Sequence, residues 1–207
     1  MDYSQYKQLE FRRKFLKIFG AEIRMVSPAN ETQTLGIIKM KAWKLREDVR
    51  LFADESLQHE ILRIGARQII DIGATYDVFD SVTNQTLFSL KRQGLKSIFV
   101  RDHWYIMDAG GNQIGDVVET SGVLALVRRW LSLFSDIAGL VFAFVPETYD
   151  ITFGTDGQQT IGGKIVHRKN PFIVKMGLDT SMAQVQVDPR LPISIVSLLS
   201  VIDAAKG

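Results

Sequence analysis

The apolar stretch near the end of the chain limits the possible folds more than any other feature. Residues 193–202 hold seven aliphatic side chains, interrupted only by Ser194, Ser197 and Ser200. A helix of this composition is apolar on every side, so it must be enclosed by protein or by lipid. Crossing a bilayer takes about 20 apolar residues, and this run is shorter. The serine hydroxyls can bond to backbone carbonyls one turn earlier, which permits burial. We therefore predict a central core helix over residues 189–205.

The chain before this helix alternates between apolar and polar residues in pairs of short segments. Turn-forming residues separate the members of each pair, which is the pattern of a β-hairpin. Five pairs are present: residues 22–26 with 35–40, 48–52 with 60–64, 75–80 with 86–91, 104–108 with 113–118, and 149–153 with 160–166. Two more strands are expected near residues 98–100 and 171–178, which gives about twelve strands. A closed antiparallel barrel leaves no exposed edge and offers an interior for the apolar helix. We therefore predict a mostly β protein with this architecture.

Residues 3–19 combine tyrosine, leucine and phenylalanine with five basic residues. This pattern predicts an N-terminal amphipathic helix within residues 1–20. Three interpretations remain open: a helix packed on the barrel, an interfacial membrane anchor, and a disordered segment. Basic residues beside phenylalanine and leucine are typical of helices that lie at an anionic membrane surface.

A second segment interrupts the hairpin pattern at residues 121–145, where apolar residues dominate. Its length would allow a membrane span. The adjacent Arg128 and Arg129 lie near its centre, and both would be costly in hydrocarbon. We therefore predict a helical insertion over residues 121–146 on the barrel surface or at a membrane interface, with a transmembrane span as the less favoured alternative.

Composition restricts the class of protein. The 207 residues suit one domain, 1–207, and the formal net charge of +2 is too small to indicate a nucleic-acid-binding protein by itself. The absence of cysteine excludes disulfides and thiolate metal sites. The first 20 residues lack the unbroken apolar core of a signal peptide. We expect a cytoplasmic protein, with a peripheral position at the inner membrane face as an open extension.

Catalytic motifs are sparse. The three histidines, His59, His103 and His167, fall in three different hairpin regions without metal-ligand spacing. Asp102 and His103 are adjacent on a predicted strand, so they point to opposite faces and cannot converge on one substrate. We expect no enzymatic activity, no metal and no cofactor.

Basic residues gather in several segments of the chain. The candidate anion- or lipid-binding residues are Lys91, Arg92, Lys96, Arg101, Arg128 and Arg129. Solvated outer faces of the barrel are the simpler interpretation of such clusters. Where turns bring clusters together, they would attract phosphate or headgroup anions. No aromatic platform accompanies them in a recognisable motif, so nucleic acid is not an expected partner.

Five short stretches and the apolar helix occur in an order that resembles a known family. They are KAWKLRED at residues 41–48, ARQIID at 66–71, ATYDV at 74–78, KRQGLKS at 91–97 and NPF at 170–172. Together they resemble the bacterial branch of the tubby-like superfamily, whose relatives include phospholipid scramblases and plant LURP-one-related proteins. The resemblance extends from about residue 20 to residue 207. It implies a twelve-stranded antiparallel barrel threaded by a hydrophobic C-terminal helix.

The resemblance carries less information about function. Tubby domains bind phosphoinositide headgroups, and scramblases are associated with calcium and lipid movement, but no residue here matches either type of site. We expect a non-enzymatic barrel protein that binds anionic lipid or a membrane surface peripherally. The alternative is a protein-interaction scaffold or homo-oligomer that uses the apolar segment 121–145.

Overall fold

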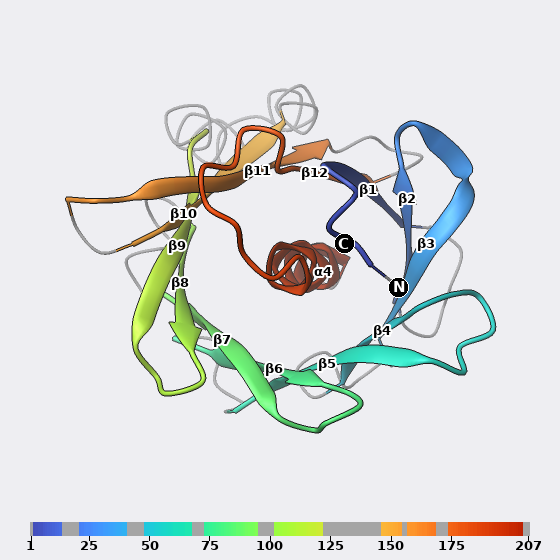
Figure 1. Cartoon of the computed structure of the whole chain (residues 1–207), viewed down its shortest axis with the longest axis horizontal. Coiled ribbons are helices and arrows are strands. Elements are labelled where there is room, and N and C mark those ends of the chain that lie inside the picture. Colours follow the sequence, from blue (N-terminus) through green and yellow to red (C-terminus); the bar gives the residue numbers. More distant parts are fainter. Residues whose placement is uncertain are drawn as a thin grey trace, which may run out of the picture.

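A computed structural model describes residues 2–13, 21–40, 48–67, 73–94, 102–121, 146–154, 157–168 and 174–204. The elements of this described part are strands β1 (Gln8–Arg13), β2 (Ala21–Ser27), β3 (Asn30–Met40), β4 (Val49–Phe52), β5 (Glu60–Ala66), β6 (Thr75–Asp80), β7 (Thr86–Arg92), β8 (His103–Asp108), β9 (Gln113–Glu119), β10 (Glu147–Phe153), β11 (Thr160–Arg168) and β12 (Val174–Asp179), and helix α4 (Arg190–Ala204). Each strand pairs with the next along the chain, and β1 pairs with β12 to close a barrel (Figure 1). The predicted barrel of about twelve strands is confirmed.

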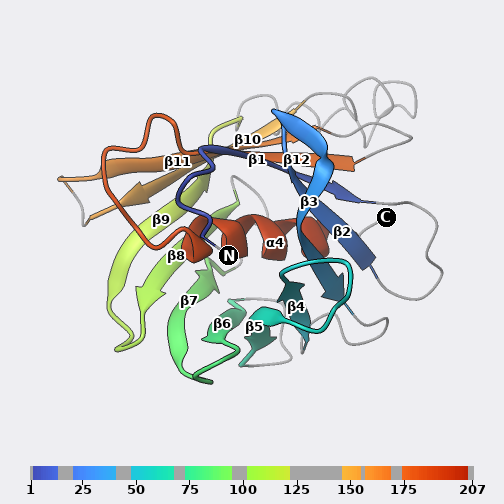
Figure 2. The same ribbon diagram turned by 45° about the vertical axis from the view of Figure 1, so that its right-hand side comes forward.

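Helix α4 occupies the centre of the barrel, as its composition predicted (Figures 1 and 2). Every residue from 191 to 201 is buried. The hydroxyls of Ser194 and Ser197 donate to the carbonyls of Arg190 and Ile193, each at 2.7 Å. Ser200 instead contacts the sulfur of Met176 on β12. The serines therefore lie in the core without an unpaired hydroxyl.

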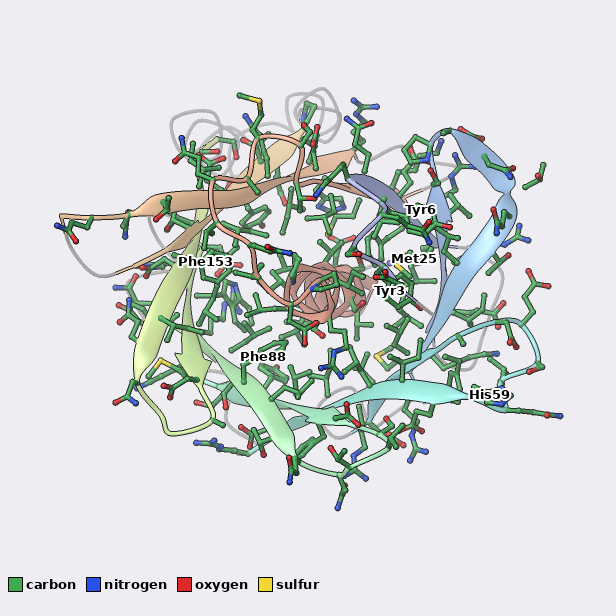
Figure 3. The ribbon with its side chains drawn as sticks, in the orientation of Figure 1. Tyr3, Tyr6, Met25, His59, Phe88 and Phe153 are labelled. Carbon is green, nitrogen blue, oxygen red and sulfur yellow. The ribbon has the colours of Figure 1, made fainter. Side chains whose placement is uncertain are left out.

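The inner wall of the barrel supplies the remainder of the core, because alternate residues of each strand point inward. Tyr3, Met25 and Phe88 lie between the wall and α4, whereas His59 lies at the outer edge of the β4–β5 loop (Figure 3). Because the wall closes around an apolar helix, the helix and the inward-pointing side chains of the wall are buried against each other.

The start of α4 is held in two ways. Asp188 accepts a hydrogen bond from the backbone N–H of Arg190, which is the role of a helix N-cap. The Arg190 guanidinium pairs with Asp188 and also with Asp80 at the end of β6. The helix entrance is thus tied to the barrel wall.

The prediction of an N-terminal helix within residues 1–20 is wrong for residues 8–13. Residues 8–13 form β1, which pairs with β12 on one side and with β2 on the other. Leu9 and Phe11 point inward and are 3% and 1% exposed. Two backbone ladders and an inward apolar pair stabilise a strand here, and a helix would leave both neighbours unpaired. Residues 14–20 lie outside the described part of the chain.

Two other predicted elements also lie outside the described residues: the strand near residues 98–100 and nearly all of the helical insertion 121–146. The twelve strands of the described residues include β1, which was not among the predicted strands.

Candidate functional site

The connections between strands divide into two chemically different groups, one at each end of the barrel. Six connections join strands at the end where α4 finishes: residues 14–20, 41–48, 67–74, 93–102, 120–146 and 169–173. Together they contain eleven Lys or Arg, five Asp or Glu, and 29 large apolar residues of the types Val, Ile, Leu, Met, Phe and Trp. We call this end of the barrel, with Lys91 and Arg168 near the last residues of β7 and β11, the basic rim.

The opposite end carries charge of the other sign. Its connections are residues 28–29, 53–59, 81–85, 109–112, 154–159 and 180–189. They contain no Lys or Arg, four Asp or Glu, and five large apolar residues. The small net charge of the chain therefore combines connections that are basic in composition at one end of the barrel with connections that are acidic at the other.

Of the six residues selected from the sequence, the structure describes Lys91 and Arg92. They are neighbours on β7, so they point to opposite faces of the barrel wall. Lys91 is exposed and has no ion-pair partner among the described residues. Lys96, Arg101, Arg128 and Arg129 lie outside the described residues.

Arg92 belongs to the interior of the barrel. Its guanidinium Nε donates to a carboxylate oxygen of Asp102 at 2.9 Å, and it stacks over the Trp104 ring, 5.5 Å from the ring centre. Such stacking adds a cation–π attraction to the ion pair. Asp102 therefore already pairs with the charge of Arg92 inside the protein. Of the two neighbours, only Lys91 is exposed to solvent.

Arg168 is a further exposed cation at the basic rim that the selection from sequence did not include. It is the last residue of β11 and has no ion-pair partner among the described residues. The buried residue before it, His167, fixes its outward direction through strand alternation. A polar residue that follows a buried one at a strand end is the signal that could have identified it.

Just inside the basic rim lies a layer of inward-pointing ionisable groups, which we call the ionisable layer. Four members lie on strands β7, β9, β10 and β11, one directly precedes β8, and one is in the last turn of α4: Arg92, Glu119, Glu147, His167, Asp102 and Asp203. Glu119 is 2% exposed and accepts hydrogen bonds from the Asp102 backbone N–H at 3.2 Å and the Ser121 hydroxyl at 3.0 Å. The layer lies between the apolar core and the strand ends at the basic rim.

His167 is the most deeply buried member of the layer, at 1% exposed. Its Nδ1 lies 3.3 Å from a carboxylate oxygen of Glu147, and its Nε2 lies 3.4 Å from one of Asp203. Burial lowers the pKa of His167, but the two carboxylates of Asp203 and Glu147 outweigh burial and hold the pKa above its ordinary value of 6.5. The nearby Tyr149 stays neutral, because burial first and then the charges of Glu147, Asp102 and Glu119 raise its pKa well above 10.

The sequence matches a known protein family. The sequence model of the LURP-one-related family matches residues 34–202, which is most of the chain. The chain belongs to the LURP-one-related family. This family is part of the tubby-like superfamily, as the sequence resemblance implied. A comparison with curated proteins gives no match, and neither does one with solved structures.

The matched LURP-one-related range begins inside β3 and ends inside α4. It includes Lys91, Arg168 and every strand of the ionisable layer. Strands β1 and β2 precede the range, yet β1 is the strand that closes the wall against β12.

The structure of this LURP-one-related barrel also shows how Asp102 and His103, considered above as an acid/base pair, are placed. His103 points outward and its Nε2 lies 2.7 Å from Asp116, whereas Asp102 points inward, so the two do not form a joint site. This agrees with the prediction. Among the described residues, no group of three or more His, Asp or Glu side chains is arranged to hold a metal ion. No helix in the described ranges is long and apolar enough to cross a membrane.

A hollow of about 630 Å³ opens at the end of the barrel opposite the basic rim. Its lining includes the buried side chains of Tyr3, Leu9, Leu178 and Ile193, and Lys7 is the one charged residue among its described lining residues. The volume is in the range of small-molecule sites. Neither Lys91 nor Arg92 lines it, so the hollow is separate from the candidate lipid-binding residues.

Proposed function

We propose that this LURP-one-related protein is a non-enzymatic barrel that binds anionic membrane surfaces through its basic rim, at the cytoplasmic face of a membrane. The observation that carries the proposal is the separation of residues between the two ends. Eleven basic and 29 large apolar residues fall in the connections of one end, and the other end has four acidic and no basic residues in its connections.

The proposed binding combines two attractions. Each basic residue close to an anionic leaflet contributes about 1 kcal/mol. Large apolar residues contribute by entering the boundary between headgroups and acyl chains, and stable peripheral binding generally takes two such signals. Because the opposite end is acidic, the same field that attracts the basic rim would repel the other end, which favours one orientation.

The contact residues of the proposal are Lys91 and Arg168 at the ends of their strands, together with Lys96, Arg101, Arg128 and Arg129 in the connections. Arg92 is not among them, because Asp102 and Trp104 already engage its guanidinium. We assign Arg92 to the support of the barrel interior.

The test is co-sedimentation with neutral and anionic vesicles at low and high salt. The double variant Lys91→Glu/Arg168→Glu should bind anionic vesicles at least about 30-fold more weakly at low salt, since about 1 kcal/mol of attraction is lost at each position and repulsion is added. Lys7→Glu is the matched control, because Lys7 is an exposed lysine at the opposite end of the barrel. The control should bind like the natural protein, and high salt should weaken all binding.

Equal losses in the double variant and in Lys7→Glu would contradict a contact at the basic rim. Absence of binding to anionic vesicles at low salt would contradict the proposal as a whole.

A variant without residues 121–145 separates membrane binding from the scaffold alternative. The structure permits this deletion, because β9 and β10 are directly paired and the Thr120 N–H donates to the Thr148 carbonyl at 2.8 Å. A short linker can therefore replace the segment. Loss of vesicle binding by a protein that is monomeric throughout would support the membrane contact. A soluble oligomer that the deletion converts to a monomer would favour the scaffold.

A further inference from the structure

A buried histidine on the barrel wall contacts the last turn of α4. His167 on β11 lies between Glu147 on β10 and Asp203 on α4. Asp203 is in the last turn of the helix, where the carbonyl end of the helix dipole disfavours a negative charge. A positive ring beside it offsets that repulsion.

The geometry of the two contacts depends on the charge of the ring. A neutral imidazole has one N–H donor and one lone pair, whereas the protonated ring donates from both nitrogens. The contact of Nε2 with Asp203, at 3.4 Å, meets the distance of an ion pair but not the geometry of a hydrogen bond. With two carboxylates on opposite sides, only the protonated ring attracts both.

We propose that His167 is a pH-operated latch, whose protonated ring fastens the last turn of α4 to β10 and β11 and whose deprotonation releases it. The proposal is independent of what the basic rim binds.

The charged and titratable groups around the ring support this assignment. Glu147, the register partner of His167, faces the ring from β10, and Asp203 faces it from α4. β12 presents the uncharged Met176, which is the register partner of His167. Tyr149, two residues further along β10, keeps its proton near neutral pH, because burial raises its pKa well above 10. His167 is therefore the group of this set that changes charge near neutral pH.

The direction of the effect follows from the raised pKa of His167. The folded state binds the proton more tightly than the unfolded chain, whose histidine pKa is near 6.5. The latch therefore contributes fully below pH 6.5 and is lost as the pH rises through the higher pKa of the folded state. At strongly acidic pH the carboxylates take up protons and the contacts weaken again.

The test is hydrogen exchange of the full chain, read by mass spectrometry at pH 6.0 and pH 8.5 and corrected for intrinsic exchange rates. Protection in the last turn of α4 should fall roughly tenfold at the higher pH, as expected for loss of one charge-assisted contact. Protection in the first turn of α4, held by Asp188 and Asp80, should be unchanged. His59→Gln is the matched control, because His59 is exposed on a loop and should leave the pH response intact.

His167→Gln and Asp203→Asn should remove the pH response, since neither variant can form the charged triad. A last turn whose protection is the same at both pH values in the natural protein would overturn the latch. So would a pH response that persists in a folded His167→Gln protein. The measurement on the natural protein decides the question even where a variant does not fold.

Discussion

At the scale of single residues, strand alternation decides which ionisable groups belong to the interior and which to the surface. Two neighbouring pairs show this: Lys91 is exposed while Arg92 is internal, and His103 points outward while Asp102 points inward. Sequence alone predicted the divergence of Asp102 and His103. It could not predict that Arg92 would meet Asp102, because their pairing depends on the register between β7 and β8.

Arg92 should matter for stability rather than for vesicle binding. Arg92→Ala leaves the Asp102 side chain, which is 12% exposed, without its cation. Removing one partner of a largely buried ion pair costs about 3 kcal/mol. Urea unfolding should show this loss, and Lys91→Ala on the same strand should change the free energy of unfolding by less than about 0.5 kcal/mol. Equal effects from the two variants would refute the inward placement of Arg92.

At the scale of elements, periodicity predicted the hairpins well and the N-terminal segment wrongly. Tyr3, Tyr6 and Leu9 are spaced as on one face of a helix, while Leu9 and Phe11 alternate as in a strand. Local pattern cannot choose between these, because the deciding partner, β12, begins at Val174, far away in the sequence. The latch was missed for the same reason, since nothing local connects His167 to Asp203.

Helix α4 is the element on which the core depends most. Leu198, at its middle, is 1% exposed. Leu198→Ala should destabilise the protein by about 3–5 kcal/mol, from lost burial and from the cavity that remains within a closed wall. Met182→Ala is the control, because Met182 is 77% exposed in the loop before the helix. Denaturant titration measures both, and a cost below about 1 kcal/mol for Leu198→Ala would contradict an enclosed helix.

At the scale of the whole molecule, the connections at the two ends of the barrel are separated by composition, basic and apolar at one end and acidic at the other. This separation was not visible in composition, because a net charge of +2 is the sum of a basic and an acidic end. It follows from the antiparallel topology, which sends alternate connections to opposite ends. The individual basic clusters were visible in the sequence, but which strand ends their connections join depends on closure of the sheet.

The three tryptophans allow the orientation on a membrane to be measured. Trp43 and Trp130 belong to connections of the basic rim, whereas Trp104 is 2% exposed inside the barrel. On anionic vesicles with brominated acyl chains, fluorescence should be quenched in Trp104→Phe, which retains the two rim tryptophans. Trp43→Phe/Trp130→Phe, which retains Trp104, should show little quenching. The reverse pattern would place another face of the barrel on the membrane.

The central position of α4 also has a consequence for the time course of folding. The helix follows all twelve strands in the chain, so the wall is complete in sequence before the group that fills it. Closure joins Gln8 to Asp179, which are 171 residues apart. Contacts of such separation form slowly. Once the wall has formed, it must open before the helix can leave. We therefore expect slow unfolding, so that the native state has a long lifetime in addition to a large free energy of unfolding.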